Sequence, residues 1–210
     1  MICIKYAPGI NIWTVKKNLK ILLAQRQKHH IVNVSRLPAA VLLPLYNKQG
    51  QCHILFIKRT ETVKEHKGQI SFPGGHPEKG DRTLLDTALR ECAEEIGLHT
   101  EDAEVLGELD DELTTTSNYI VSPFVAAIPW PYHFTANKEE VEEIIEVPIS
   151  ALLDKNCLHR NMELVDGKMT ESYAYLYQGR IIWGATARIL NRFLDIFTRA
   201  LQDRKRHAGG

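Results

Sequence analysis

The stretch GGHPEKGDRTLLDTALRECAEEIGL, residues 74 to 98, places a glycine turn before a segment with the periodicity of a helix. At 3.6 residues per turn, residues 84 to 96 form one helix whose apolar side chains share a face: Leu85, Ala88, Leu89, Cys92 and Ile96. Gly97 follows directly and is typical of the residue that ends a helix in the left-handed conformation. The stretch therefore predicts a central helix packed on a core.

The same helix carries three acids on one side, because Glu94 and Glu95 follow Glu91 by about one turn. Like charges at these spacings repel by about a few tenths of a kcal/mol per pair. Carboxylate oxygens are hard ligands that suit Mg²⁺ or Mn²⁺, ions that keep open positions for phosphate oxygens. Gly74 and Gly75 lie just before the helix, where backbone N–H groups can approach a phosphate. The alternative is a solvated acidic face, but the two features together favour a metal-dependent phosphate site.

This stretch resembles the Nudix box, written G-x5-E-x7-R-E-U-x-E-E-x-G-U with U an apolar residue. Its fixed positions are occupied by Gly75, Arg90, Glu91, Cys92, Glu94, Glu95, Gly97 and Leu98. Asp81 stands where the box has Glu, and eight residues rather than seven separate it from Arg90. Both departures are also those of the coenzyme A pyrophosphatase branch of the family, which this chain resembles.

A second motif of that branch, roughly L-L-T-x-R-(S/A)-x3-R-x3-G-x3-F-P-G-G, resembles the residues upstream of the box with its spacing kept. The matching positions hold Leu55, Phe56, Ile57, Arg59, Thr60, Lys64, Gly68, Phe72, Pro73, Gly74 and Gly75. Lys64 stands where the motif has Arg, which keeps the charge and loses the bidentate fork. His66 and Gln69 also match residues common in this branch, and the resemblance covers residues 34 to 201.

The resemblance implies a Nudix-type α/β/α sandwich, an α/β fold with a mixed β-sheet between helices. It also implies metal-dependent hydrolysis, with the cation held by Glu91, Glu94 and Glu95. Arg90 would orient these carboxylates through ion pairs, and the expected catalytic residues are Arg90, Glu91 and Glu94. The expected substrate-binding residues are Arg59, Lys64, His66, Gln69, Gly74 and Gly75.

The general base stays open between the helical acids and a later acidic segment, residues 139 to 146 (EEVEEIIE). A Glu from this later part of the Nudix fold often completes the metal site or acts as base, and the candidates are Glu139, Glu140, Glu142 and Glu143. Most of these four must be solvated. Tyr119 is similarly ambiguous: it would stack on a base or line the pocket, whereas a lone aromatic residue beside a strand more often belongs to the core.

Composition favours an ordinary globular protein. The 210 residues include 26 Lys and Arg and 26 Asp and Glu, so the net charge is zero and no overall field attracts nucleic acid or an anionic membrane. The four cysteines, Cys3, Cys52, Cys92 and Cys157, show no metal-ligand spacing and fit a reducing, cytoplasmic location. No apolar stretch is long enough to span a membrane, and we expect no secretory signal. A homodimer is left open.

Three parts are expected along the chain: a helical extension over residues 1 to 33, a Nudix hydrolase domain over residues 34 to 203, and a mobile tail over residues 204 to 210. The extension is predicted to be an amphipathic helix from the spacing of Ile12, Val15, Leu19, Leu22 and Leu23. Predicted strands cover residues 36–46, 53–59, 105–109, 119–129, 173–177 and 180–183, the first two forming a hairpin. Helices are predicted at residues 150–153 and 184–201.

The substrate that fits the resemblance best is coenzyme A or an acyl derivative, a small-molecule nucleotide diphosphate that would give 3′,5′-ADP and (acyl-)4′-phosphopantetheine. Alternatives within the same enzyme class are ADP-ribose, NADH and nucleoside triphosphates. A different class is a non-catalytic binding module that keeps the fold. The three mutually repelling acids argue against such a module, because a protein without a metal site has no reason to keep them.

Overall fold

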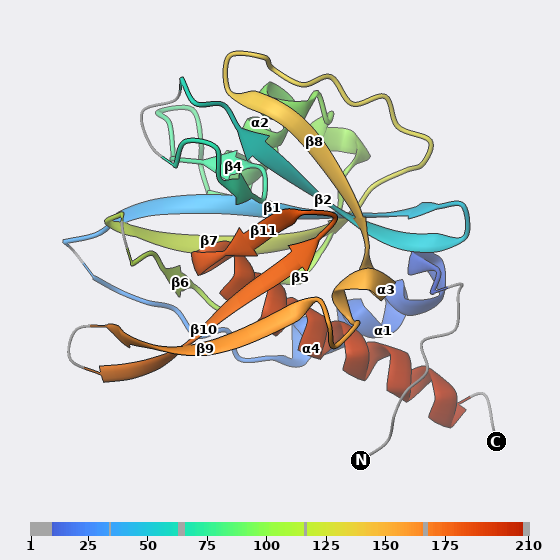
Figure 1. Cartoon of the computed structure of the whole chain (residues 1–210). Coiled ribbons are helices and arrows are strands. Elements are labelled where there is room, and N and C mark those ends of the chain that lie inside the picture. Colours follow the sequence, from blue (N-terminus) through green and yellow to red (C-terminus); the bar gives the residue numbers. More distant parts are fainter. Residues whose placement is uncertain (1–9, 34, 63–65, 116, 166–167, 208–210) are drawn as a thin grey trace.

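The structure is a computed structural model that describes residues 10–33, 35–62, 66–115, 117–165 and 168–207. Its elements in chain order are α1 (Ile12–Gln25), β1 (Leu37–Lys48), β2 (Gln51–Arg59), β3 (Ile70–Ser71), β4 (Gly74–Gly75), α2 (Leu84–Ile96), a 3-10 turn (Thr100–Asp102), β5 (Glu104–Glu108), β6 (Glu112–Leu113), β7 (Tyr119–Ala127), β8 (Val141–Pro148), α3 (Ile149–Leu152), β9 (Leu158–Val165), β10 (Lys168–Tyr177), β11 (Arg180–Trp183) and α4 (Gly184–His207). Figure 1 shows their arrangement.

The main sheet is mixed, as predicted. Its strands run in the order β3–β2–β1–β7–β5, with β4 also pairing with β1, β6 with β7 and β8 with β2. The β1–β7 pair is parallel, with Leu37 opposite Tyr119 and Leu45 opposite Ala127, while β1 and β2 form the predicted antiparallel hairpin. In Figure 1 this sheet crosses the middle of the molecule, with α2 on one side and α1 and α4 on the other.

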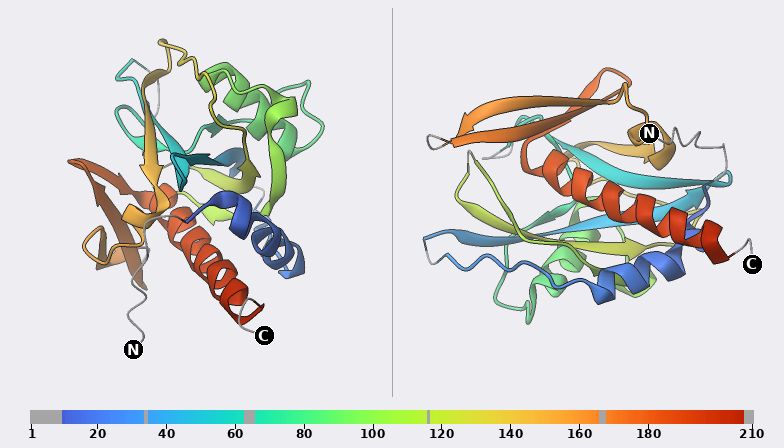
Figure 2. Two further views of the ribbon diagram at one scale, coloured as in Figure 1. Left: turned by 90° about the vertical axis from the view of Figure 1, so that its right-hand side faces the viewer. Right: turned by 90° about the horizontal axis from the view of Figure 1, so that it is seen from below.

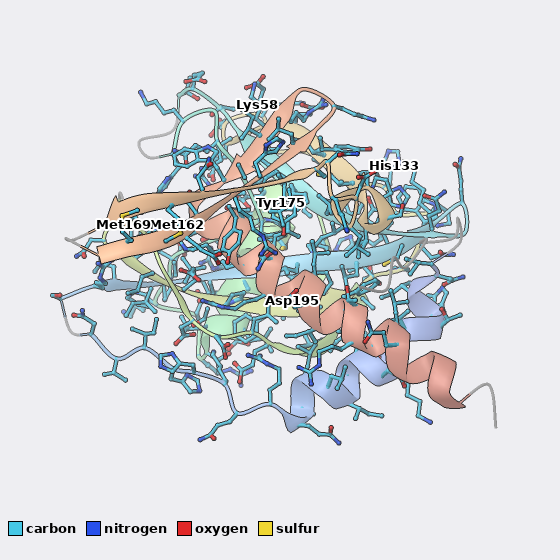
Figure 3. All side chains as sticks on the ribbon, turned by 60° about the horizontal axis from the view of Figure 1, so that its bottom comes forward. Lys58, His133, Met162, Met169, Tyr175 and Asp195 are labelled. Atoms are coloured by element: carbon cyan, nitrogen blue, oxygen red, sulfur yellow. The ribbon has the colours of Figure 1, made fainter. Side chains whose placement is uncertain are left out.

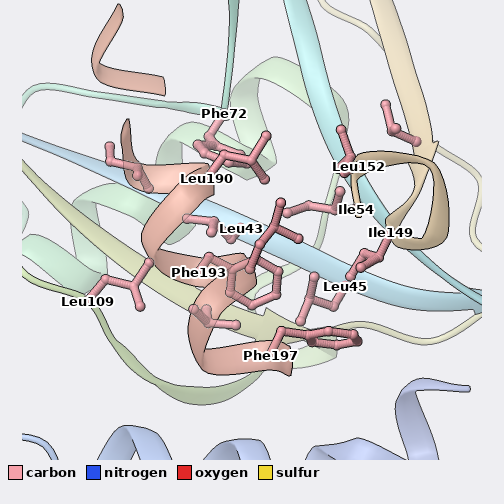
Figure 4. Packing of buried hydrophobic residues seen from close by; sticks show 14 of the residues in the cluster. Leu43, Leu45, Ile54, Phe72, Leu109, Ile149, Leu152, Leu190, Phe193 and Phe197 are labelled. Carbon is pink, nitrogen blue, oxygen red and sulfur yellow. The ribbon is translucent and has the colours of Figure 1, made fainter. Parts of the chain in front are cut away.

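Alternation along β1 explains the two layers of core. Successive side chains of a strand point to opposite faces of its sheet. Leu42 and Tyr46 therefore pack in one buried cluster with the apolar face of α2. Leu43 and Leu45 point the other way and pack in a second cluster with Phe193 of α4 and its neighbours (Figure 4). Burial of one such side chain stabilises the fold by about 1.5–3 kcal/mol, so the packing on each face stabilises the helices that cover it.

The first helix forms as predicted and belongs to the second of these clusters. Ile12, Val15, Leu19 and Leu23 are all buried there, and the side-chain amide of Asn18 donates to the carbonyl of Ala200 in α4 at 3.2 Å. The helix thus packs directly on the sandwich. Treating residues 1–33 as a separate extension stays a prediction.

A second, three-stranded antiparallel sheet lies alongside α4, with its strands in the order β11–β10–β9 (Figure 2). The pattern of the sequence predicted β10 and β11 but not β9. Tyr175 and Ile182 from the inner face of this sheet are buried in the same cluster as Phe193, so α4 is packed on both sides. The first turn of α4 lies beside the main sheet, at the site described below.

The chain end differs from the prediction in one respect. Helix α4 continues to His207, so residues 204–207, expected to begin a tail, extend the helix by about one turn. Their mobility stays a prediction, and residues 208–210 lie outside the described structure. Within the described residues, no helix is both long enough and apolar enough to cross a membrane.

Candidate active site

The central helix begins and ends through local capping. Thr83 accepts a hydrogen bond from the N–H of Asp86, and the Asp86 side chain accepts one from the N–H of Thr83, a reciprocal capping box. Gly97 adopts the left-handed conformation with φ 69°, and its N–H donates to the carbonyl of Ala93. These two caps confirm the predicted helix, residues 84 to 96, at both ends.

The glycine turn before the helix is a short strand, β4, held against β1. Gly74 has φ +152°, and a Cβ at this position would lie 2.2 Å from the carbonyl oxygen of Ala40, so only glycine fits. Its N–H donates to Glu95 Oε2 at 2.9 Å. The expectation that this N–H approaches a phosphate is therefore wrong for Gly74, because the carboxylate already occupies it.

Glu95 is the buried member of the acid group, with 1% of its surface exposed. Its Oε1 lies 3.2 Å from Arg59 Nη1 at the end of β2. Burial raises the pKa of Glu95 to about 8, assisted by the charges of Glu91 and Glu140, although the Gly74 N–H and Arg59 act in the opposite direction. The site thus favours a proton, or another positive charge, on this carboxylate.

Glu91 and Glu140 face the same space. Burial raises the pKa of Glu91, and the neighbouring charges of Glu94 and Glu140 add to the shift, while Arg90 opposes it. Glu140 lies in the turn directly before β8 and lines the cleft with Glu91 and Glu94. This position distinguishes it from the other acids of the later segment.

The side chains of two of those other acids, Glu142 and Glu143, have partners elsewhere. Glu142 pairs with Lys58 at 2.7 Å, Glu143 pairs with Arg180, and the carbonyl of Glu139 accepts a hydrogen bond from Thr60 Oγ1. None of these three is a lining residue of the cleft. Of the four candidates, the structure thus brings only Glu140 to the helical acids.

Arg90 joins the acids, as the resemblance implies. Its guanidinium lies 3.1 Å from Asp81, 3.1 Å from Glu91 and 2.8 Å from Glu94. The hydrogen bond from Arg90 is the main cause that lowers the pKa of Asp81 to about 2. Because the guanidinium is not among the groups that line the cleft, its contacts describe a positioning residue. Asp81, the residue that departs from the box, keeps the role of Arg90 partner.

A cleft of about 400 Å³ opens beside these acids. Its lining includes Glu91, Glu94 and Glu140, and also the loop at residues 114–115, Tyr119, Trp183 and the first turn of α4. Tyr119 packs on the core and also stacks on His76, with 4.4 Å between ring centroids. Both alternatives considered for Tyr119 are thus correct in part.

Most of the expected substrate-binding residues reach this cleft. Arg59, His66, Gln69, Gly74 and Gly75 all line it, while Lys64 lies outside the described residues. His66 is oriented by its neighbours, with Nδ1 2.9 Å from Gln69 Oε1 and Nε2 3.1 Å from Ser117 Oγ. Among the described lining residues, Arg59 is the one lysine or arginine.

The carboxylates of Glu91, Glu94 and Glu95 suit a divalent cation by their chemistry, although they are not arranged around a common point. Within the described part of the chain, no three or more His, Cys, Asp or Glu side chains are gathered closely enough to hold a metal ion. Glu91 and Glu94 both contact Arg90, and Glu95 contacts Arg59. However, the three carboxylates are hard oxygen donors that repel one another, and the pKa values of Glu91 and Glu95 are raised, so Mg²⁺ or Mn²⁺ would neutralise their charge.

The lining residues that were not predicted include His76 and Trp183. His76 follows Gly75 directly and stacks on Tyr119, and Trp183 ends the last strand beside α4. Their place in the cleft depends on the packing of β7 and of the second sheet. No local pattern carries that information.

Comparisons with known proteins identify the family of this chain. The family model described as "NUDIX domain" matches residues 35–173. The "Uncharacterized Nudix hydrolase NudL" of Photorhabdus laumondii is 36% identical over 154 residues, which cover 73% of this chain and 81% of the relative. A Yersinia pestis protein of the same name is 33% identical over 161 residues, covering 77% and 80%. A MutT/nudix family protein from Enterococcus faecalis has the same fold, with a TM-score of 0.51 at 16% identity, over 85% of this chain and 71% of that one.

The fold and the acid-lined cleft thus define a Nudix-type hydrolase scaffold. The chain belongs to the Nudix domain family.

Proposed function

We propose that this chain hydrolyses the diphosphate bond of coenzyme A or an acyl derivative, giving 3′,5′-ADP and (acyl-)4′-phosphopantetheine. The observation that supports it best is the cleft whose lining contains Glu91, Glu94 and Glu140 together with Arg59. A diphosphate needs both kinds of group, cations for its charge and carboxylates for a metal and a base. The choice of coenzyme A rests on the two motifs of the sequence.

In this mechanism, Glu91, Glu94 and Glu95 would hold Mg²⁺ or Mn²⁺. When bound, such an ion supplies neutralisation of the phosphate charge and a lower pKa for water. Glu140 takes a proton from the attacking water, because it is close enough to the helical acids to raise their pKa values. Arg90 keeps Glu91 and Glu94 oriented through its ion pairs.

The substrate phosphates lie toward Arg59 and Gly75, with His66 and Gln69 forming the adjacent wall. Arg59 already forms an ion pair with Glu95. A cation that is free to bind the extra 3′-phosphate of coenzyme A therefore has to come from Lys64 or its neighbours in the sequence. ADP-ribose and NADH lack this phosphate and remain the alternative substrates. Free, buried Cys52, Cys92 and Cys157 fit the proposed cytoplasmic location.

A competition assay tests the proposal. Coenzyme A, dephospho-coenzyme A, ADP-ribose and NADH are mixed at equal, subsaturating concentrations with Mg²⁺ or Mn²⁺, and products are identified by mass spectrometry. We expect coenzyme A to be cleaved at least about tenfold more efficiently than ADP-ribose or NADH, or about 1.4 kcal/mol in transition-state binding. EDTA should abolish cleavage.

Two variants make the assay specific to the site. Glu91→Gln should lose most activity, whereas Glu142→Gln, an acid paired with Lys58 outside the cleft, should stay close to wild type. Faster loss of ADP-ribose would overturn the choice of coenzyme A and leave the hydrolase intact. No cleavage with either metal would favour a binding module.

A further inference from the structure

Exposed apolar side chains concentrate on the second sheet. Nine large hydrophobic side chains are exposed among the described residues, and five of them lie on β9–β11: Met162, Met169, Leu176, Ile181 and Trp183. Figure 3 shows Met162 and Met169 toward the free end of the β9–β10 hairpin. Trp183 differs from the other four because it lines the active-site cleft.

The three tryptophans of the chain are in different environments. Lys16 Nζ lies 4.5 Å from the centroid of the Trp13 ring. Trp130 stacks on Tyr46, with 5.0 Å between centroids and 15° between planes. In contrast, neither an aromatic ring nor a cation from the described residues contacts the ring of Trp183, and 46% of its surface is exposed.

The strand partner of Trp183 leaves its ring uncovered as well. In the β10–β11 pairing the residue directly opposite is Ala174, whose methyl group covers little of an indole. A large aromatic ring is therefore presented in a concave site without an aromatic or cationic partner among the described residues. An indole is also an effective stacking surface, because base–aromatic stacking contributes about 1–3 kcal/mol per base.

We propose that Trp183 is the surface on which the nucleobase of the substrate stacks. The inference rests on the proposed function, in that every adenine-containing candidate places a base on one side of the diphosphate. With the diphosphate bound beside Arg59 and Gly75 and its reacting phosphorus facing Glu91 and Glu140, the base extends to β11 and the first turn of α4. Trp183 is thus a specificity-determining residue that contacts the base and leaves the reacting phosphorus atoms to the acids.

The neighbours of Trp183 provide a way to distinguish a bound base from other ligands of this surface. Ile181 and Leu176 lie opposite each other and continue the same face of the sheet, outside the cleft. An apolar arm of the substrate, or a second copy of the chain, would cover Ile181 together with Trp183. A base is small enough to need Trp183 alone. Ile181→Ala is therefore a matched control, since Ile181 is 54% exposed on the same strand.

The test measures binding, so it does not depend on which diphosphate is cleaved. AMP, 3′,5′-ADP and 4′-phosphopantetheine are titrated into the full chain, with intrinsic tryptophan fluorescence and calorimetry as readouts. We expect both adenine nucleotides to quench the fluorescence. Trp183→Phe should remove the quenching and keep most of the affinity, and Trp183→Ala should raise Kd at least about tenfold. Trp13→Phe and Ile181→Ala should quench and bind as wild type does.

The remaining outcomes overturn the proposal. Quenching that persists in Trp183→Phe would place the base elsewhere. A loss of 4′-phosphopantetheine binding in both Trp183→Ala and Ile181→Ala would show that an apolar arm occupies this face, and a change in oligomeric state would show a second copy. Wild-type protein that binds neither nucleotide also rejects it. If coenzyme A is not cleaved but AMP binding still depends on Trp183, only the choice of substrate is wrong.

Discussion

The backbone N–H of Gly74 donates to the carboxylate of Glu95 at 2.9 Å and so ties the glycine turn to the last turn of the central helix. The second carboxylate oxygen lies 3.2 Å from Arg59 at the end of β2. One buried acid therefore connects three elements that border the cleft. Glu95 has a structural role as well as the proposed role in metal binding. Experiments on metal-free protein measure the structural role alone.

Neutralising Glu95 should change how the stability of the metal-free protein depends on pH. Burial raises its pKa from the ordinary 4.5 to about 8. Between these values the folded state holds a proton that the unfolded state lacks. The free energy of unfolding therefore falls as pH rises through this window. At about 1.4 kcal/mol per pKa unit, the fall is on the order of a few kcal/mol. We expect Glu95→Gln to remove most of that fall, measured as Tm in EDTA across pH 4–9.

The control is Glu94→Gln on the same helix. The side chain of Glu94 is 53% exposed, so its neutralisation should change the pH profile much less. A Glu95→Gln profile as steep as that of wild type would contradict burial as the cause.

The Asp81–Arg90 pair predicts a pH dependence of the opposite sign. Hydrogen bonding to Arg90 lowers the pKa of Asp81 from 3.8 to about 2, so the stability it supplies is present above pH 4 and lost as pH falls toward 2. Asp81→Asn should therefore lower the free energy of unfolding at pH 7 and matter little near pH 2, as measured by urea denaturation.

Activity gives the same pair a second readout. Without its Asp81 partner, Arg90 orients Glu91 and Glu94 less well, so Asp81→Asn should lower kcat more than it changes KM. Asp81→Glu, which supplies the residue of the family box, should restore most of the rate. Equal kinetics for Asp81→Asn and wild type would remove Arg90 from its positioning role.

The parts of the fold that were predicted correctly are those whose signals are local. The central helix, residues 84–96, has its caps and its apolar face within its own sequence, and both ends were found. Strand β9, with the sequence LHRNMELV, was missed because its polar and apolar residues do not alternate cleanly. Its pairing with β10, for example Leu158 with Tyr175, is what makes it a strand.

The site shows the same limit. The spacing of the Nudix box was enough to bring Arg90 to its acids, since all lie on one helix and the turn before it. It was not enough to choose among the acids of residues 139–143. That choice depends on Lys58 and Arg180, partners far away in the chain that engage Glu142 and Glu143. The occupied N–H of Gly74 likewise depends on the fold.

Gly74→Ala should damage the protein where Gly80→Ala does not. A Cβ on Gly74 would lie 2.2 Å from a backbone oxygen and 2.7 Å from the Cα of Val41, contacts that neither strand can relieve. We expect Gly74→Ala to cost about 3 kcal/mol or more, or to prevent folding. Gly80 has no heavy atom within 4 Å of an added Cβ, so its variant should unfold within about 0.5 kcal/mol of wild type. Equal losses in thermal or urea unfolding would contradict the close approach of β4 to β1.

Glu140→Gln should abolish most activity while its three neighbours tolerate the same change. Glu140 alone among the later acids lines the cleft, and its charge contributes to the raised pKa values of Glu91 and Glu95. Loss of a general base lowers kcat by about 10²–10⁴-fold, and we expect this range with little change in unfolding. Glu142→Gln and Glu143→Gln should stay within about threefold of wild type, because their ion pairs lie outside the cleft, and so should Glu139→Gln, because Glu139 does not line it. The pH profile of kcat separates the proton transfer from a purely structural effect, since removing the base should flatten its acidic limb. A variant of Glu142 or Glu143 as inactive as Glu140→Gln would move the base to that residue.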